Sequence, residues 1–337
     1  MAATHRLGFT GDVMLGRQVD AVYRESQRSP AAVWGNLQPT LRGLDGLFVN
    51  LECCLATSGE PSPGRRFHFR ADPEWSTAAL RAATVDCCSL ANNHAMDFGH
   101  RALEETLDEL AAADIETVGA GRSLEAAHQP IAVDYRGLTV AVVAFTDNTP
   151  QYAATTDRPG TAHVEFDPDD ERSMAVLSEA VETAKTRFDP DILVASLHWG
   201  PNNRTHPKES HQQVARRLAD WGVDLVAGHS AHLFQGVELL DRGESPTVVR
   251  YDMGDFVDDY AVDPTDRNDR SFLFELVVDD SGTLIELQLH PTEIESRAVY
   301  QASDRGAAWC RQTMIERSEP FDTAFERAGK GLAVSLT

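Results

Sequence analysis

Short apolar, β-branched runs alternate with longer segments of helical periodicity over the first 230 residues of the chain. The runs predict strands at residues 7–10, 47–50, 85–90, 140–145, 192–197 and 225–227. The longer segments predict helices at residues 100–113, 170–188 and 209–221. Strands that alternate with helices are typical of α/β folds, in which helices cover a sheet. We therefore expect an α/β fold.

The pattern changes after residue 236, where strands follow one another without intervening helices. These strands are expected at residues 237–240, 248–251, 272–278 and 284–289, and closing helices at 303–316 and 320–328. No Pro/Gly/Ser-rich linker divides the chain. We expect one domain over residues 1–337, with a core at about 5–292 and C-terminal helices at about 303–328.

The charge balance is strongly acidic. Thirty Lys and Arg residues stand against 53 Asp and Glu residues, which gives a net charge of −23. This balance argues against a nucleic-acid partner, because binding to a phosphate backbone needs basic residues. The acidic residues are spread along the whole chain, and only three of the basic residues are lysine. Such a dispersed negative surface predicts a halophilic protein in a high-salt cytoplasm, where salt screens the self-repulsion.

The chain has no signal for membrane insertion or secretion. No run of about 18 apolar residues occurs, and the N-terminus has no long apolar stretch with a cleavage site. We expect a cytoplasmic protein without an integral membrane segment. The five cysteines are two adjacent pairs and one single residue, which is a poor disulfide framework and predicts buried free thiols: Cys53, Cys54, Cys87, Cys88 and Cys310.

Six apolar runs are each followed at once by a polar cluster. The clusters are Gly11-Asp12, Asn50-Leu51-Glu52, Asn92-Asn93-His94, His198-Trp199-Gly200, Gly228-His229-Ser230-Ala231-His232 and Asp252-Met253-Gly254-Asp255. In α/β sheets the carboxyl ends of the strands form the crevice where ligands bind. We expect the six clusters to meet at one edge of the sheet.

Each cluster alone has an ordinary structural explanation. A Gly-Asp pair can cap a helix, a buried Asn can satisfy loop backbone, and a single His most often packs or donates a hydrogen bond. Together, however, six of these residues carry carboxylate, amide and imidazole donors of the kind that bind Zn, Mn or Fe: Asp12, Glu52, Asn93, His198, His229 and His232. The set predicts one or two divalent transition metals, with Glu52 able to bridge two ions about 3.5–4 Å apart.

The six clusters, in order, resemble the CapA family of poly-gamma-glutamate capsule biosynthesis proteins, part of the calcineurin-like metallophosphoesterase superfamily. The resemblance covers about residues 7–260, and its specific segments are Asn92-Asn93-His94-Ala95-Met96-Asp97-Phe98-Gly99 and Gly228-His229-Ser230-Ala231-His232. It implies a four-layer α-β-β-α sandwich of the metallo-dependent phosphatase type, with two sheets flanked by helices and a metal site at the sheet edge.

The resemblance also implies roles for the ligands. Asp12 would bind the first metal, which His232 would complete, and Glu52 would bridge. The second metal would take Asn93, His198 and His229. His94 falls where the superfamily keeps a histidine that protonates the leaving group.

Four features depart from the family pattern. Met14 stands where the superfamily places a histidine, and Glu52 replaces an aspartate. The last histidine motif is one residue longer, ending at His232. Asp255 occupies the place of an asparagine common in CapA-type proteins. The first three departures leave both one metal and two metals open.

The predicted activity is hydrolysis of a phosphoester or a γ-glutamyl-type amide by metal-activated water, on a small-molecule or anionic polymer substrate. His94 or Asp97 would donate the proton to the leaving group. Four further residues are expected to contact the substrate: Arg17, Asn50, Asn92 and Trp199. Arg17 would grip a phosphate or carboxylate, or else pair with local acids, and Trp199 would form a pocket wall, or else pack over the strand end. The alternative function is a non-catalytic component that binds, helps synthesise or helps export an anionic polymer such as poly-gamma-glutamate.

Overall fold

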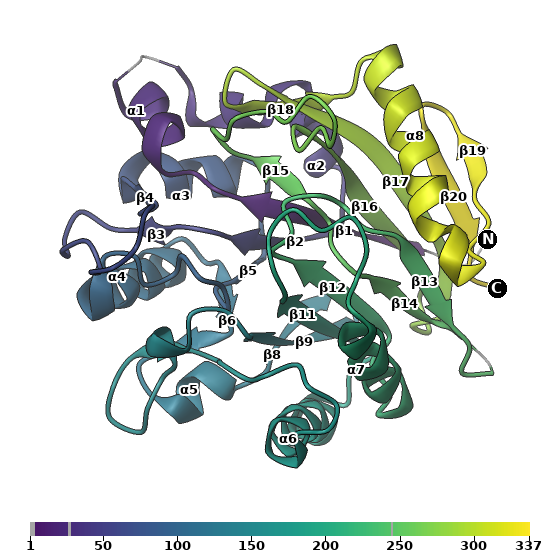
Figure 1. The fold of residues 1–337 in the computed structure, drawn as a ribbon, viewed down its shortest axis with the longest axis horizontal. Helices are drawn as coiled ribbons and strands as arrows, with labels where there is room; N and C mark the ends of the chain where they lie inside the picture. The colour runs from purple at the N-terminus through teal and green to yellow at the C-terminus, as the bar shows by residue number, and fades with distance from the viewer. Residues whose placement is uncertain (1–3, 26–27, 244) are drawn as a thin grey trace.

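The computed structural model describes residues 4–25, 28–243 and 245–337. Two β-sheets pack face to face, and helices cover the outer face of each (Figure 1). Helices α1 (Arg17–Glu25), α3 (Pro73–Ala82) and α4 (Gly99–Ala112) pack on the larger sheet, and α6 (Glu171–Phe188) and α7 (Glu209–Asp220) pack on the smaller one. The predicted α/β class and the four-layer α-β-β-α sandwich are confirmed.

The larger sheet combines a parallel half and an antiparallel half, in the order β19-β20-β17-β16-β1-β2-β5-β6. Its parallel strands are β1 (Thr4–Val13), β2 (Gly46–Leu51), β5 (Cys87–Ser89) and β6 (Glu116–Val118). Its antiparallel strands are β16 (Arg270–Asp279), β17 (Leu284–Glu295), β20 (Gly331–Ser335) and β19 (Glu326–Ala328). Two short strands pair beside this path: β15 (Asp255–Val257) with β1, and β18 (Ala298–Gln301) with β17.

The smaller sheet has the order β13-β14-β12-β11-β9-β8. Its central strands are parallel: β9 (Leu138–Thr146), β11 (Ile192–His198), β12 (Leu225–His229) and β14 (Thr247–Arg250). Antiparallel strands close its edges: β13 (Val237–Leu240) and β8 (Ile131–Tyr135). Short elements complete the fold: β3 (Cys54–Leu55), β4 (Arg70–Ala71), β7 (Ala120–Gly121), β10 (Gly160–Thr161), α2 (Gln38–Leu41), α5 (Leu124–His128) and the 3₁₀ turns Pro30–Leu37 and Pro150–Tyr152.

The central strands are apolar on both faces because both faces are covered. In β9, Val140 and Val142 point into the core between the sheets, whereas Val143 and Phe145 point outward to the layer that contains α6. Successive side chains of a strand point to opposite faces, so a strand buried on both sides has a continuous apolar run. This burial places the polar clusters at the strand ends, where the apolar runs stop.

The C-terminal segment differs from the prediction. The first closing helix is present as α8 (Asp304–Ser318), but the predicted helix at 320–328 is wrong. A 3₁₀ turn at Glu319–Phe321 ends where Asp322 takes a left-handed backbone with φ 55°, which stops helical propagation. The exposed edge strand β19 follows at Glu326, and its three residues are too few to show an alternating pattern. The C-terminal strand β20 continues the large sheet, and the single domain over the whole chain stays a prediction.

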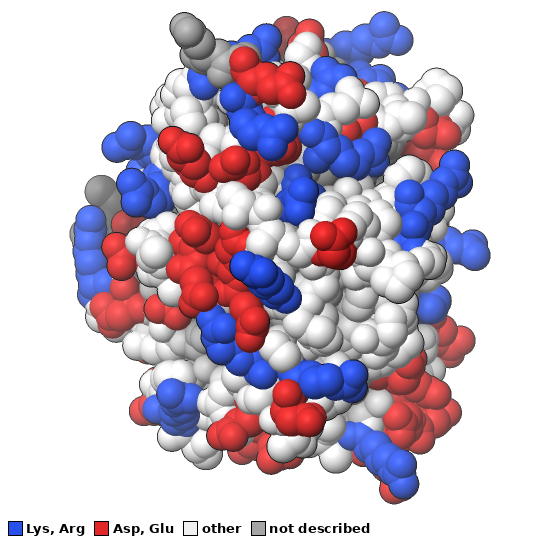
Figure 2. All heavy atoms as spheres, turned by 90° about the vertical axis from the view of Figure 1, so that its left-hand side faces the viewer, with Lys and Arg blue, Asp and Glu red and all other residues white. Residues whose placement is uncertain are grey.

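Charged side chains of both signs are interspersed on the face drawn in Figure 2. The predicted adaptation to high salt and the cytoplasmic location stay predictions. Within the described ranges, no helix is both long and apolar enough to cross a bilayer. All five cysteines are buried and free, so the prediction of free thiols is confirmed.

Candidate metal centre

Side chains from both sheets meet where the parallel strands end. Asp12 lies near the end of β1, and Glu52 follows β2 in the larger sheet. His198 and His229 are the last residues of β11 and β12 in the smaller sheet, where they are register partners. Asp255 begins β15 and pairs in register with Asp12. Residues far apart in the chain therefore share one edge of the sandwich.

Short distances connect the carboxylates and the imidazoles. His229 Nδ1 lies 3.0 Å from Asp12 Oδ1, and His198 Nε2 lies 3.4 Å from Glu52 Oε1. His232 Nδ1 lies 2.9 Å from Asp255 Oδ1 and 3.5 Å from Asp12 Oδ2. One possible ligand atom from each of Asp12, Glu52, His232 and Asp255 lies within 4.8 Å of the other three.

The donor atoms at this edge fit a divalent cation. Among the buried side-chain atoms that have no hydrogen-bond partner in the described part of the chain, five belong to the predicted ligands and Asp255: Asp12 Oδ2, Glu52 Oε1, Asn93 Oδ1, His198 Nε2 and Asp255 Oδ2. Burying a carboxylate oxygen without a partner costs several kcal/mol, so it needs a compensating charge. Four of the five atoms belong to residues that the sequence predicted as ligands, and the fifth belongs to Asp255.

Electrostatics inside the group are strongly coupled. Burial favours the neutral form of Asp12, but hydrogen bonds with His229 and His232 outweigh it and lower the Asp12 pKa far below its usual range. Burial raises the pKa of Asp255 well above its ordinary value. Burial disfavours the cationic form of His232, yet the charges of Asp255 and Glu52 raise its pKa well above 6.5. Without a metal, the imidazoles thus balance the charge of Asp12, while burial favours a neutral Asp255.

Two asparagines support the site from behind. Asn50 Nδ2 donates a hydrogen bond to Asp12 Oδ1 at 2.8 Å, and Asn92 Nδ2 donates to Asn50 Oδ1 at 3.1 Å and to the Leu51 carbonyl at 2.9 Å. Asn92 Oδ1 accepts a hydrogen bond from the His94 backbone N–H at 3.0 Å. Both residues are fully buried. The structure therefore places these two predicted substrate contacts in a buried amide chain that joins the ends of β2 and β5.

His94 and Asp97 form a tight pair in the turn that precedes α4. His94 Nδ1 lies 2.5 Å from Asp97 Oδ2, which also accepts a hydrogen bond from the Phe69 backbone N–H at 2.8 Å. Arg65 Nε lies 3.1 Å from Asp97 Oδ1, and the Phe69 ring stacks on the imidazole with centroids 3.8 Å apart. These contacts fix the ring and occupy Nδ1. Nε2 is the ring atom left to exchange a proton.

A pocket of about 550 Å³ opens beside this pair and the metal-ligand group. Its lining includes Arg17, Phe67, Phe69, His94, His232 and Tyr260. The Arg17 guanidinium lies 5.3 and 5.5 Å from the ring centres of Phe67 and Phe69, and its Nε lies 3.4 Å from Asp259 Oδ2. Arg17 thus both pairs with a local acid and faces the pocket.

Trp199 lies outside this pocket lining, although the sequence placed it beside a predicted ligand. It is buried, stacks on His211 with ring centroids 4.5 Å apart, and donates a hydrogen bond from Nε1 to the Tyr251 carbonyl at 2.8 Å. Of the two alternatives, the structure shows packing over the strand end.

Two residues that contact the ligand group, Asp255 and Tyr260, were not predicted as site residues from the sequence. Asp255 lies in the sixth polar cluster, so its position after a strand was a usable signal. Tyr260 donates a hydrogen bond from its hydroxyl to Glu52 Oε2 at 3.2 Å, and its ring lies against His232. The sequence around Tyr260 contains no pattern that predicts this hydrogen bond, because the contact depends on the path of the loop after β15.

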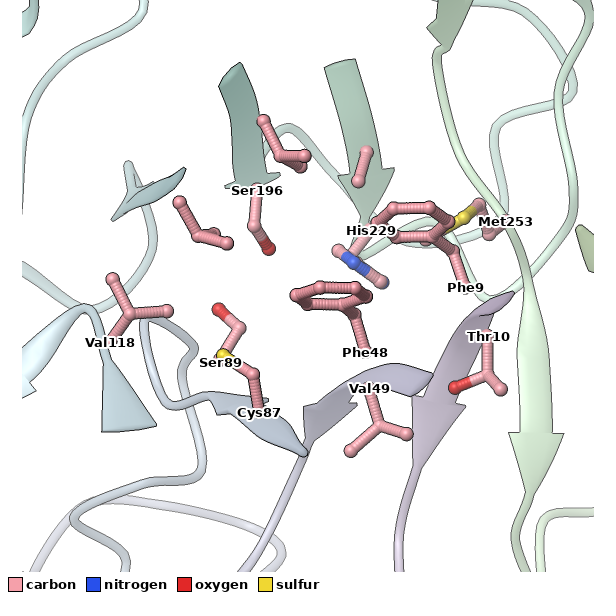
Figure 3. A pocket seen from close by; sticks show the side chains of 13 residues that line it. Phe9, Thr10, Phe48, Val49, Cys87, Ser89, Val118, Ser196, His229 and Met253 are labelled. Carbon is pink, nitrogen blue, oxygen red and sulfur yellow. The ribbon is translucent and has the colours of Figure 1, made fainter. Parts of the chain in front are cut away.

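A second, much smaller cavity lies between the two sheets behind His229. Its volume is about 20 Å³, and the side chains of Ser89 and Ser196 extend into it from opposite sheets (Figure 3). The remaining lining is mostly apolar and includes Phe9 and Phe48. This space is large enough for about one water molecule and is therefore too small for a substrate.

The protein is a four-layer α/β sandwich in which carboxylates and imidazoles from the two sheets lie close together at one edge. Comparison with known families makes this more specific. The chain belongs to the family of the bacterial capsule synthesis protein PGA_cap, whose model matches residues 6–260. The resemblance to the CapA family seen in the sequence is confirmed.

Two relatives of this chain carry names from polymer biosynthesis. A probable polyglutamine synthesis accessory protein of Mycobacterium tuberculosis is 32% identical over 351 residues, covering 92% of this chain and 90% of that protein. The PGA biosynthesis protein CapA of Bacillus subtilis is 31% identical over 254 residues, covering 74% of this chain and 62% of that protein.

Solved structures with similar architecture are more distant. A hypothetical protein from Thermus thermophilus has a TM-score of 0.48 and 20% identity, covering 86% of this chain and 99% of that chain. The NAD nucleotidase of Haemophilus influenzae has a TM-score of 0.47 and 10% identity, covering 95% of this chain and 56% of that chain.

Proposed function

We propose that this protein is a metal-dependent hydrolase that cleaves a phosphoester or a γ-glutamyl-type amide of an anionic substrate during capsule polymer biosynthesis. One observation carries the proposal. Buried carboxylate and imidazole atoms without hydrogen-bond partners in the described ranges converge at the strand ends, and two histidines next to them, His94 of the histidine–aspartate pair and His232, line a pocket of about 550 Å³. Buried polar atoms with only a structural role nearly always have hydrogen-bond partners within the protein, so the lack of partners here favours a bound cation.

Asp12, Glu52, His232 and Asp255, which lie close together, would hold one ion. Asn93, His198 and His229 would hold a second ion together with Glu52, as the resemblance implied. We propose one or two Mn, Fe or Zn ions here. Such ions supply an activated water nucleophile and stabilise negative charge on the oxygen of the bond that breaks.

The protein's own residues would orient the substrate and move the proton. Asp97 holds His94 through Nδ1, so Nε2 is the atom that donates a proton to the leaving oxygen or nitrogen. Arg17 lines the pocket and is the cation that would pair with a substrate phosphate or carboxylate. Phe67 and Phe69 flank the guanidinium and limit its motion, which favours one orientation of the bound anion.

A test begins with the full-length protein loaded with Mn²⁺, because the chemistry requires the metal. Hydrolysis is measured with p-nitrophenyl phosphate, bis(p-nitrophenyl) phosphate and γ-glutamyl-p-nitroanilide. His94→Gln is expected to lower kcat by about 10²–10⁴-fold, the usual contribution of a general acid, with unchanged Mn²⁺ affinity. The matched control is His290→Gln, because His290 also pairs with a carboxylate, at 2.8 Å from Glu275, but lies outside the pocket lining.

The outcomes separate catalysis from binding. Stoichiometric Mn²⁺ with no turnover of any of the three substrates would favour the alternative, a non-catalytic component that binds an anionic polymer. Full activity in His94→Gln would remove the proposed acid while leaving a metal-dependent hydrolase in place. Loss of activity in both histidine variants would show that the assay reports folding rather than chemistry.

A further inference from the structure

We infer that Arg17, Arg24 and Arg70 form a second anion-binding subsite, in a hollow that one chain segment separates from the pocket of the proposed hydrolase. Its ligand is a carboxylate or phosphate group of the same substrate, away from the bond that is cleaved. The inference rests on the proposed function only in taking the first pocket as a substrate site. It deepens that function, because it requires a substrate with at least two anionic groups.

This hollow, called here the arginine hollow, has a volume of about 350 Å³ and is separate from the strand-end metal group. It is lined by residues of α1, of β4 and of the turn before α4, and β4 lies between the two helices (Figure 1). Its lining includes Arg17, Arg24, His68, Arg70 and Phe98. Arg17 also lines the pocket of about 550 Å³, so this residue joins the two spaces.

The segment that leads into β4 forms the wall between the two spaces. Phe67 and Phe69 line the larger pocket, whereas His68 and Arg70 line the arginine hollow. Such alternation is typical of extended backbone, in which successive side chains point to opposite sides. A ligand that occupies both spaces therefore passes over this wall beside Arg17.

A glycine allows the wall to pack against the start of α1. A Cβ atom on Gly16 would lie 2.8 Å from the backbone nitrogen of Arg70 and 3.1 Å from Phe69 Cα. Arg17 is the next residue in the chain, and its Nε lies 3.4 Å from Asp259 Oδ2. This pairing uses Nε and leaves the two terminal nitrogens of the guanidinium to donate to an anion.

The other two arginines are also available to a ligand. Arg70 has no carboxylate partner among the residues that the structure describes; it donates a hydrogen bond to the Ser58 carbonyl at 3.4 Å, and its guanidinium carbon lies 4.1 Å from the centre of the Phe98 ring. Stacking on a ring fixes a guanidinium and leaves its in-plane N–H donors free. Arg24 Nη1 lies 3.8 Å from Asp20 Oδ2, and the Arg24 side chain is 54% exposed.

Two aspartates line the arginine hollow as well, but they accept hydrogen bonds from the protein. Asp20 Oδ1 accepts from the Asp72 N–H at 2.8 Å and from Trp75 Nε1 at 2.7 Å. Asp72 Oδ1 accepts from the Glu74 N–H at 2.9 Å and caps α3. The lining thus has three arginines against two aspartates, in a chain whose net charge is −23. An excess of positive charge in a hollow of so acidic a protein favours an anionic ligand.

The two spaces together favour an extended substrate. A ligand with one anionic group pairs with Arg17 alone, whereas a ligand with several acidic groups also reaches Arg24 and Arg70. Guanidinium groups pair with carboxylates and phosphates alike through charge-assisted hydrogen bonds. Because the second contact is made within a complex that has already formed, affinity rises steeply with the number of linked groups.

The experiment measures binding rather than turnover. Full-length protein loaded with Mn²⁺ is titrated into fluorescein-labelled γ-linked glutamate, as a monomer and as a pentamer, and the initial fluorescence anisotropy, before any cleavage, gives both dissociation constants at low salt. The pentamer is expected to bind about tenfold more tightly than the monomer. Arg70→Gln is expected to weaken pentamer binding by about fivefold and to leave monomer binding within about twofold.

A second variant has a closely matched control. Arg24→Gln is expected to weaken pentamer binding by about threefold. The control is Arg216→Gln, because the Arg216 side chain is 49% exposed and pairs with Glu238 at 3.4 Å, but lies on α7, outside both linings. It removes the same charge and is expected to leave both dissociation constants unchanged. Circular dichroism checks that each variant folds, and Arg24→Gln still decides should Arg70→Gln fail to fold.

Competition identifies the chemistry of the second anion. Displacement of the labelled pentamer by unlabelled γ-linked pentaglutamate at a lower concentration than by tripolyphosphate supports the subsite with carboxylate as its ligand. The reverse order supports the subsite with phosphate as its ligand. Displacement of the pentamer from Arg70→Gln at the same concentrations as from the unsubstituted protein contradicts the subsite.

Two further results would overturn the inference: equal affinities for monomer and pentamer, or losses in Arg24→Gln and Arg70→Gln no larger than in Arg216→Gln. Its failure is distinct from failure of the proposed hydrolase. Protein that binds the pentamer through Arg70 but hydrolyses no substrate contradicts only the hydrolase. Active protein whose pentamer affinity survives both substitutions contradicts only the subsite.

Discussion

Substituting Gly11 with alanine tests whether the close approach of β15 to β1 builds the site. The added Cβ would lie 1.9 Å from the Gly254 carbonyl oxygen and 2.7 Å from the Met253 oxygen, both backbone atoms that cannot rotate away. Relieving the first contact to an ordinary 3.4 Å requires the strands to separate by about 1.5 Å. That movement breaks the 2.8 Å hydrogen bond from the Asp12 N–H to the Gly254 carbonyl.

The expected cost follows from these two effects. Overpacking a buried position costs about 1–3 kcal/mol, and a lost buried hydrogen bond adds about 1 kcal/mol. We expect Gly11→Ala to lower the free energy of unfolding by about 2–4 kcal/mol, measured by urea denaturation followed by circular dichroism. Because Asp255 moves with β15, Mn²⁺ affinity is also expected to fall at least tenfold.

Gly8→Ala is the matched control on the same strand. Its Cβ would meet only side-chain atoms, the nearest being Leu44 Cδ1 at 2.4 Å, and a leucine side chain can rotate. We expect a loss below about 1 kcal/mol and unchanged Mn²⁺ affinity. If Gly11→Ala costs no more than Gly8→Ala and binds Mn²⁺ equally well, the reasoning about strand approach is refuted.

Two further predictions concern buried charges that are not proposed metal ligands. Burial disfavours ionisation of Glu275, but hydrogen bonds with His290 and Arg6 outweigh it and lower the pKa of Glu275 from 4.5 to about 2. The stabilisation from the ionised Glu275 is fully present above pH 4.5 and is lost as the pH falls through 2. Glu275→Gln should therefore lower the free energy of unfolding at pH 7 by about 2 kcal/mol, which is less than the full linkage value because the Arg6 side chain is 43% exposed. The difference between the variant and the unsubstituted protein should shrink progressively below pH 4.5. A pH-independent difference in urea denaturation would contradict this. The Arg250 guanidinium is fully buried over the Phe9 ring, none of its nitrogens has a hydrogen-bond partner in the described ranges, and burial lowers its pKa to about 9. Arg250→Met should therefore raise the melting temperature and stabilise the fold by about 1–3 kcal/mol, and a destabilised variant would reveal a partner for the charge.

Local patterns were sufficient for the class of fold and for most of the ligand group. Apolar runs followed at once by Asp12, Glu52, His198 or His229 mark strands buried on both faces that end at the solvent edge. Parallel strands end on the same side, so listing the polar residues after each run approximated the site. The chemistry of the donors then suggested a metal.

Other features depended on contacts between distant segments. Asp255 joins the group through the register between β15 and β1, and Tyr260 reaches Glu52 because its loop folds back over the pocket. Trp199 directly follows the end of β11, a position from which the sequence predicted a pocket wall or packing, and in the structure it packs against His211. The edge strand β19 is short and exposed, and two of its three residues, Glu326 and Arg327, are charged, so periodicity did not separate it from a helix.

Hydrophobic periodicity and residue chemistry act locally, and they established the alternating strands and helices, the acidic surface and the kinds of donor atoms present. Distances within 4.8 Å between residues 12, 52, 232 and 255 arise only when two sheets pack and a short strand inserts beside β1. The physical reason is that side-chain packing and backbone pairing across sheets set geometry at the scale of an ångström, whereas a sequence pattern specifies only which face or strand end a residue occupies.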